Sequence, residues 1–235
     1  MAVFTIADLH LSLGTNKPMD VFKGWHNYTE RIKENWTRAV SDEDTVVVSG
    51  DISWAMRLKD TDADFSFINN LPGKKIFIKG NHDYWWSTAA KFHAFCEQKG
   101  FTTLELLHNN CFFFGEYAVC GTRGWFLDEE QKPHNAKVLN RELLRLETSL
   151  KAAGERSILC FLHYPPLYQG YECPEIISLL KDYIDIWLPD FKYFDNELAF
   201  RYSKAKNYFE QASASIAQMI RQTGTPEYTL HPSSV

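Results

Sequence analysis

Four short apolar segments of this chain each stop abruptly at polar residues, and this arrangement constrains the fold more than any other feature of the sequence. The segments are Val3–Ala7, Thr45–Val48, Lys75–Ile78 and Ser157–Leu162. Short runs rich in Val, Ile and Phe are typical of strands that are buried on both faces of a sheet. We therefore expect four buried strands, with polar loops at their ends.

Helical patterns lie between these segments. Apolar residues recur at helical spacing over residues 28–40 and again over residues 139–150, as in amphipathic helices that pack on a sheet. The segment 111–120, with Gly115 at its centre, predicts a β-hairpin. A weaker helical pattern covers about residues 203–222. Alternating strands and helices followed by a hairpin predict a layered α/β or α+β fold.

The composition excludes several classes of protein. The 235 residues are 45% hydrophobic and 23% charged with a net charge of −5, which is ordinary for a globular protein and gives no sign of a broad electrostatic surface for nucleic acid. No apolar run approaches the roughly 20 residues of a membrane span, and no signal peptide is recognisable. The five cysteines lack C-x-x-C spacing, which favours reduced thiols. We expect a cytoplasmic protein.

The polar residues at the strand ends are candidates for one shared site. They are Asp8, His10, Asp51, Asn81, His82, Asp83 and His163. Loops at the carboxyl ends of strands in an α/β sheet converge on one edge, where ligands bind. Carboxylate, imidazole and amide groups without thiolates suit divalent ions such as Mn, Fe or Zn. We therefore predict a metal centre that is built from Asp8, His10, Asp51, Asn81 and His163.

Such a centre would have a defined chemistry. Two neighbouring ions can clamp a phosphoryl group and generate a metal-bound hydroxide near neutral pH, and the two oxygens of Asp51 make it the candidate bridge between them. His82 need not be a ligand, because a cationic imidazole can stabilise phosphoryl oxygens or protonate the leaving group. Asp83 would orient His82 and keep it charged. His82 and Asp83 are thus the candidate catalytic residues.

Each element also has a simpler interpretation. Asp-x-His tripeptides occur by chance, Gly50-Asp51 and Gly80–Asp83 are compatible with ordinary turns, and a single histidine such as His163 is more often structural than a ligand. We favour the metal interpretation because four such elements follow four predicted strands.

Other polar and aromatic residues are expected to be structural. Asp62 and Asp64 fit a solvated helix face, and Arg123 fits a surface or structural position. The aromatic residues after Asp83 are expected in the core or in a cleft wall, with stacking on a nucleobase as the less favoured alternative. They are Tyr84, Trp85 and Trp86.

The combined motifs resemble the calcineurin-like metallophosphoesterase family. Its pattern runs Asp-x-His, Gly-Asp, Gly-Asn-His-(Asp/Glu), a later His and a final Gly-His-x-His, and the first four parts correspond to Asp8–His10, Gly50-Asp51, Gly80–Asp83 and His163. The flanking residues look like an uncharacterised bacterial branch of that family. The resemblance covers roughly residues 1–183.

The resemblance implies a two-sheet β-sandwich flanked by helices, with a dinuclear metal site at one edge. It implies one ion on Asp8, His10 and Asp51, and a second ion on Asp51, Asn81 and His163. It also places His82 at the phosphoryl group and leaving group, with Asp83 behind it.

The final Gly-His-x-His motif is absent after His163, although in the family it supplies one ligand to each ion. The chain changes character near residue 184, so we divide it into a metallophosphoesterase domain, residues 1–183, and an atypical tail, residues 184–235. Three explanations stay open: a frameshift near codon 184, a true replacement of the last segment, or new ligands such as His231 or Asp190. We favour the frameshift because the loss is abrupt and the preceding motifs are intact.

These observations predict a phosphatase or phosphodiesterase that uses two divalent ions, with manganese among the candidates, on a phosphoester of undefined class. The alternative is a weak or inactive metal- or phosphate-binding remnant, which the missing motif supports. A third hypothesis is a hydrolase with a single ion on the side of Asp8, His10 and Asp51. The sequence does not predict an oligomeric state.

Overall fold

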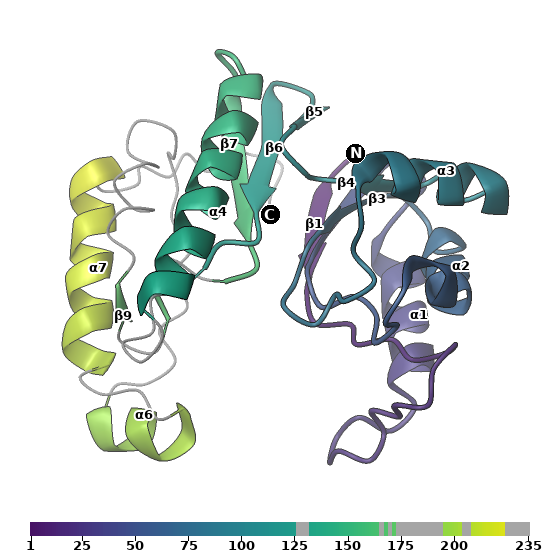
Figure 1. Cartoon of the computed structure of the whole chain (residues 1–235), viewed down its shortest axis with the longest axis horizontal. Helices are drawn as coiled ribbons and strands as arrows, with labels where there is room; N and C mark the ends of the chain where they lie inside the picture. The colour runs from purple at the N-terminus through teal and green to yellow at the C-terminus, as the bar shows by residue number, and fades with distance from the viewer. Residues whose placement is uncertain (126–131, 165–166, 169–170, 173–194, 204–207, 224–235) are drawn as a thin grey trace, which may run out of the picture.

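A computed structural model describes residues 1–125, 132–164, 167–168, 171–172, 195–203 and 208–223. Its chain forms two larger β-sheets that pack face to face, with helices on their outer faces (Figure 1), and a small third sheet whose two strands lie at residues 167–168 and 171–172. This arrangement confirms the predicted two-sheet sandwich flanked by helices.

The first sheet is entirely parallel and contains three of the four predicted strands. Its order is β1 (Val3–Ile6), β2 (Thr45–Ser49), β3 (Lys74–Ile78) and β4 (Leu104–Leu106). All five residues of β2 are buried, because this strand has a neighbour on each side and a packed layer on each face. Parallel neighbours need crossover connections, and helices provide them here.

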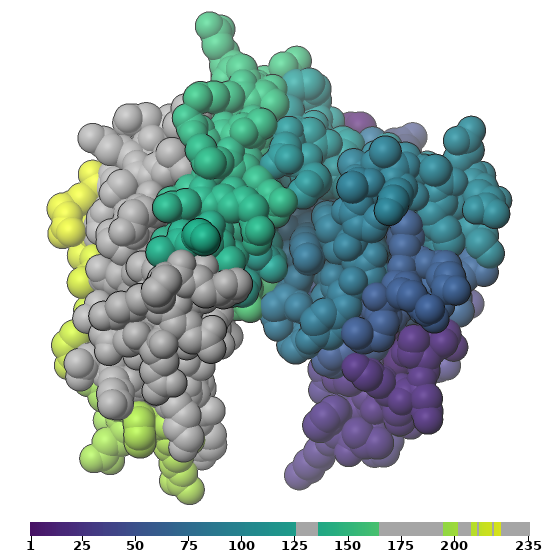
Figure 2. Space-filling model, in the orientation of Figure 1, coloured from purple at the N-terminus to yellow at the C-terminus, as the bar shows by residue number. Residues whose placement is uncertain are grey.

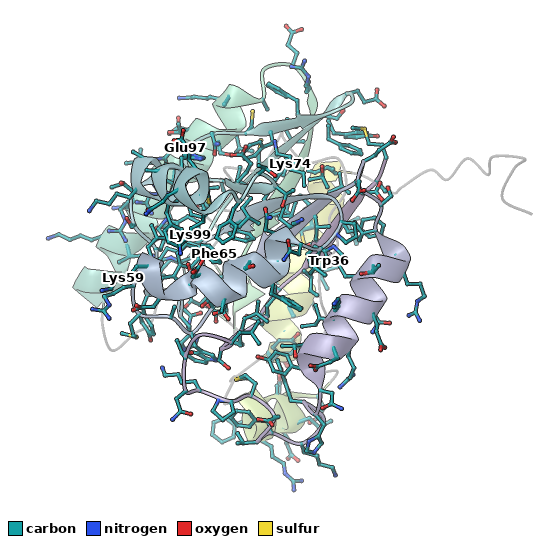
Figure 3. The ribbon with its side chains drawn as sticks, turned by 90° about the vertical axis from the view of Figure 1, so that its right-hand side faces the viewer. Trp36, Lys59, Phe65, Lys74, Glu97 and Lys99 are labelled. Carbon is teal, nitrogen blue, oxygen red and sulfur yellow. The ribbon has the colours of Figure 1, made fainter. Side chains whose placement is uncertain are left out.

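The crossover helices cover the outer face of the first sheet. They are α1 (Tyr28–Ala39), the 3-10 helix η1 (Leu58–Thr61), α2 (Asp62–Asn69) and α3 (Ala89–Lys99). Trp36 of α1 and Phe65 of α2 are buried in the apolar cluster between these helices and the sheet (Figure 3). Figure 3 also shows the charged side chains Lys59 and Lys99 on the outer side of this layer.

The second sheet contains the predicted hairpin and the fourth predicted strand. The hairpin strands β5 (Phe112–Phe114) and β6 (Tyr117–Thr122) are antiparallel, and β7 (Ser157–Leu162) pairs with β6 in parallel. The long helix α4 (Lys132–Ala152) packs on this sheet through Leu139, Leu146 and Leu150. These leucines belong to the helical pattern of the sequence.

A third apolar cluster joins the two sheets. Val47, Ile76 and Ile78 of the first sheet meet Leu107 and Val119, and Val119 belongs to β6. The carboxyl ends of β2 and β3 are thereby held beside the end of β7.

The remaining described elements come from the last third of the chain. They are β8 (Leu167–Tyr168), β9 (Tyr171–Glu172), α6 (Asn196–Ser203) and α7 (Tyr208–Thr223). The weak helical pattern corresponds to α7, whereas α6 was not predicted. Asp190 and His231 lie outside the described residues. No helix in the described part combines the length and the apolar character that crossing a membrane requires.

Two expectations about burial were wrong. Strands β1 and β7 are only partly buried, and among the described strands each lies at the edge of its sheet. Asp64 does not face solvent: its side chain is fully buried and accepts hydrogen bonds from the backbone N–H of Leu13 (2.7 Å) and from the hydroxyl of Ser53. A buried carboxylate needs such partners, and in this position it fixes two loops that lead to the candidate site.

Candidate metal centre

The four predicted strand ends meet at one edge of the sandwich. Two backbone hydrogen bonds join the loop after β1 to the loop after β2. Asp8 N donates to Gly50 O (3.1 Å), and His10 N donates to Asp51 O (2.9 Å). His163, which follows β7 of the other sheet, reaches across to Ser49 O with Nδ1 at 2.8 Å. Two backbone hydrogen bonds and one histidine side chain therefore join residues that are far apart in sequence.

Asp51 occupies the centre of this arrangement. Its side chain is 4% exposed, and three imidazoles surround its carboxylate. His82 Nδ1 lies 2.7 Å from Oδ2, His10 Nε2 lies 3.7 Å from Oδ2, and His163 Nε2 lies 3.7 Å from Oδ1. The backbone N–H of His82 also donates to Oδ1 at 2.8 Å. One buried carboxylate whose two oxygens face different histidines can thus be shared between two neighbouring ligand sets.

The backbone at three predicted ligands is in the left-handed region. Asp8, His10 and Asp51 have φ values of 53°, 45° and 51°, and the other described non-glycine residues with positive φ are Asn27 and Asn109. A strained backbone of this kind costs of order 1–3 kcal/mol per residue and clusters at functional sites. Three strained residues at one site indicate that this backbone conformation is kept because it orients their side chains, although it lowers local stability.

The histidine and amide groups have the tautomers and spacing that a cation needs. The carbonyl of Ser49 can only accept a hydrogen bond, so Nδ1 of His163 donates to it and leaves Nε2 as the nitrogen that can face a cation. Nε2 lies 2.8 Å from Oδ1 of Asn81. Two electron-pair donors at this separation can bind one ion at about 2.1 Å each. A histidine that binds a metal through one nitrogen normally donates the N–H of the other nitrogen to such a carbonyl. His163 and Asn81 therefore fit a divalent ion.

His10 lies in a less polar setting. Its Nδ1 atom is buried without a hydrogen-bond partner among the described residues, and its ring stacks on Trp54 at 4.8 Å with an interplanar angle of 19°. Burial lowers the pKa of His10, and the nearby carboxylate of Asp51 opposes this shift. A lowered pKa favours the neutral imidazole, which is the form that binds metals.

The ligand-bearing groups form two triplets that share Asp51. One is His10, Asp51 and His82, and the other is Asp8, Asp51 and His163. The resemblance implies a different division, in which Asp8 and His10 share an ion and His82 is not a ligand. Both divisions place Asp51 between two sets.

Asp83 does not take the position expected for it behind His82. Its fully buried carboxylate accepts hydrogen bonds from the backbone N–H groups of Asp51 (3.0 Å), Ile52 (2.8 Å) and Gly80 (2.7 Å), and from the indole N–H of Trp85 (2.9 Å). Burial raises the pKa of Asp83, while the backbone donors favour its charged form. Asp83 thus ties the loop of Asp51 to the loop of Asn81, and His82 hydrogen-bonds to Asp51 instead.

Position 80 requires a glycine because its backbone lies close to Asp51. A Cβ atom there would collide with Oδ1 and the backbone nitrogen of Asp51. We expect Gly80→Ala to displace Asp51 and to weaken Mn²⁺ binding at least about tenfold, as supporting changes around metal ligands do; isothermal titration calorimetry would measure this.

The matched control is Gly100→Ala. Nothing lies within 4 Å of a Cβ at Gly100, although its φ of 71° strains an alanine. This variant should lose stability and keep its metal affinity. Equal loss of affinity in both variants would show that Gly80 acts through general stability.

Some aromatic residues near the site lie in the core, and others lie beside the candidate ligands. Trp85 is buried, whereas Tyr84 is 51% exposed and lies edge-on to His82, with ring centroids 6.2 Å apart. Trp54 contacts both His10 and His82, a role that its position three residues after Asp51 did not indicate. Arg123 forms an ion pair with Glu142, with 3.3 Å between Nη2 and Oε1, as expected of a structural arginine.

Comparisons with known proteins identify the family of this chain. The chain matches the calcineurin-like phosphoesterase family over residues 1–192, which confirms the resemblance found in the motifs. No curated protein matches the sequence.

Several solved structures resemble this one distantly. A protein of unknown function from Aquifex aeolicus is 19% identical, with a TM-score of 0.39, over 69% of this chain and 90% of its own. Phosphopantetheinyl hydrolase from Mycobacterium tuberculosis is 13% identical, with a TM-score of 0.45, over 70% and 68%. A protein from Thermus thermophilus is 14% identical, with a TM-score of 0.46, over 77% and 76%.

Proposed function

We propose that this chain, which belongs to the calcineurin-like phosphoesterase family, hydrolyses a phosphoester at a centre of two divalent ions that share Asp51. The observation that carries the proposal is the buried Asp51 carboxylate with His10, His82 and His163 around it. Family membership supports metal-dependent hydrolysis in general, and the shared carboxylate supports two ions.

Asp51, His163 and Asn81 would each have a different role in holding the ions. When bound, divalent ions supply positive charge for the phosphoryl oxygens and acidify a water molecule. Asp51 would hold both ligand sets at a fixed separation. His163 would be locked in its binding tautomer by Ser49, and Asn81 would contribute its amide oxygen beside it.

His82 is the residue that would act on the substrate directly. Its ring is 37% exposed, whereas those of His10 and His163 are 14% and 8% exposed. It is therefore the imidazole most open to a phosphoester. A positioned imidazole that donates a proton to the leaving group contributes about 10²–10⁴-fold to a rate.

We expect His82→Asn to lower kcat at least about 100-fold while the protein keeps its two ions per chain. Metal analysis by inductively coupled plasma mass spectrometry, on the same samples used for kinetics, separates the two effects. His93→Asn is the control, because His93 is exposed on α3 and belongs to none of the motifs. Loss of one ion in His82→Asn would instead make His82 a ligand, as its triplet with His10 and Asp51 would allow.

A second candidate function is a catalytically weak metal- or phosphate-binding protein. Two observations favour it: the chain has no Gly-His-x-His motif, and Asp8 is exposed at the end of an edge strand. Mn²⁺-supported hydrolysis of p-nitrophenyl phosphate and of bis(p-nitrophenyl) phosphate distinguishes the candidates. Turnover of either ester supports the hydrolase, and folded, metal-loaded protein that cleaves neither supports the binding protein.

The division at residue 184 remains our proposal. We infer that residues 184–235 are an atypical tail produced by a frameshift. The nucleotide sequence tests this: a Gly-His-x-His motif in another reading frame shortly after codon 184 supports the frameshift, and its absence from all frames contradicts it.

A further inference from the structure

We propose that Lys17 and Trp54 form an anion-binding position beside the metal centre, so that the preferred substrate is a phosphoester with a second anionic group. The inference rests on the proposed function, because it places this position next to a centre that binds phosphoryl groups. It adds a substrate class and a residue outside all the motifs.

Trp54 connects Lys17 to the candidate ligands. The indole stacks on His10 at 4.8 Å, and its centroid lies 4.9 Å from that of His82. The ammonium of Lys17 lies 4.6 Å from the same ring centroid, within the range of a cation–π interaction. These distances place the ammonium within about 10 Å of His10, which is close to the Debye length at 0.1 M salt.

The loop that carries Lys17 is anchored on both sides. Before Lys17, the carbonyl of Leu11 accepts a hydrogen bond from Trp54 N (2.9 Å), and the backbone N–H of Leu13 donates to the buried Asp64. After it, the indole N–H of Trp54 points to the sulfur of Met19 at 3.3 Å. The segment of residues 13–27, purple in Figure 2, projects from the body of the molecule. Lys17 is thus held over Trp54 although its side chain is exposed.

Lys17 has no ion-pair partner among the described residues. Lys74 and Lys99 pair with Glu105 and Asp62, but Lys17 forms no ion pair with a described carboxylate and contacts the face of an indole instead. A lysine ammonium is a compact point charge that suits phosphate oxygens. Lys17 contacts Trp54 and none of the candidate metal ligands. Its ammonium is therefore placed to bind a second anionic group of the substrate, and not the phosphoryl group under attack.

Two matched phosphonates test this inference without requiring turnover. Hexylphosphonate carries one anionic end, and hexane-1,6-bisphosphonate carries a second at about the required distance. Calorimetric titration of the Mn²⁺-loaded full chain should show about tenfold tighter binding of the bisphosphonate. A factor of two comes from its two identical ends, and about fivefold comes from Lys17, the upper range for an exposed ion pair.

In Lys17→Ala the preference should fall to about twofold, and Lys17→Arg should restore most of it. Lys23→Ala removes the same charge from an exposed position on the same loop and should keep the full preference. A preference that survives Lys17→Ala, or that falls equally in Lys23→Ala, overturns the inference. If neither phosphonate binds, the inference is also overturned. Lack of turnover by a chain that still binds the bisphosphonate through Lys17 would refute only the hydrolase.

Discussion

Replacing Asp83 with alanine should lower the free energy of unfolding by at least about 3 kcal/mol and should abolish metal binding. The substitution leaves the N–H groups of Asp51, Ile52 and Gly80 and the indole of Trp85 buried without an acceptor, and each unsatisfied buried donor costs about 1–3 kcal/mol. It also separates the loop of Asp51 from the loop of Asn81. Urea denaturation with and without Mn²⁺ measures both effects.

Two further variants make this prediction specific. Asp83→Asn keeps one acceptor oxygen and should lose less stability than Asp83→Ala. Asp62→Ala removes an exposed carboxylate whose only described ion pair is with Lys99 at 2.7 Å, and a surface pair contributes about 1 kcal/mol or less. If Asp83→Ala were as stable as Asp62→Ala, Asp83 would not connect the two loops in solution.

The second large effect is expected at Asp51. Asp51→Asn preserves the shape of the side chain and the oxygen that accepts the N–H of His82, but it removes the charge at the centre of both triplets. Supporting residues around metal ligands alone contribute about 10–100-fold to affinity or activity, so a shared ligand should contribute at least about 100-fold. Both ions and the phosphoesterase activity should be lost together.

The control for Asp51→Asn is Asp42→Asn, which makes the same charge change at an exposed position before β2. It should retain both ions. Circular dichroism of Asp51→Asn should show native secondary structure, because its carboxylate mainly serves the site and not the core. Retention of one ion by Asp51→Asn would mean that Asp51 serves a single ion and does not bridge two.

The strands and their meeting point could be predicted because both follow from local pattern. Runs such as Thr45–Val48 specify buried strands, and the ends of neighbouring strands must meet at a sheet edge. His163 was expected at the same site, although the pairing of β7 with β6 that brings it to Ser49 was not predicted.

The remaining details depend on tertiary contacts that no local pattern encodes. Asp83 looked like a partner of His82 because they are adjacent, but its acceptors are used by backbone donors from another loop. Asp64 was expected on a solvated helix face, but its buried carboxylate accepts hydrogen bonds from Leu13 and Ser53. Lys17 had no signal at all, because its position over Trp54 depends on how the loop after His10 folds back.

The shared role of Asp51 is the central claim, and anomalous diffraction from crystals of the full chain grown with Mn²⁺ tests it most directly. We predict two manganese peaks per chain, both within coordination distance of the Asp51 carboxylate, one on the side of His10 and the other on the side of His163. A single peak, or two peaks of which only one contacts Asp51, would contradict this account of the site.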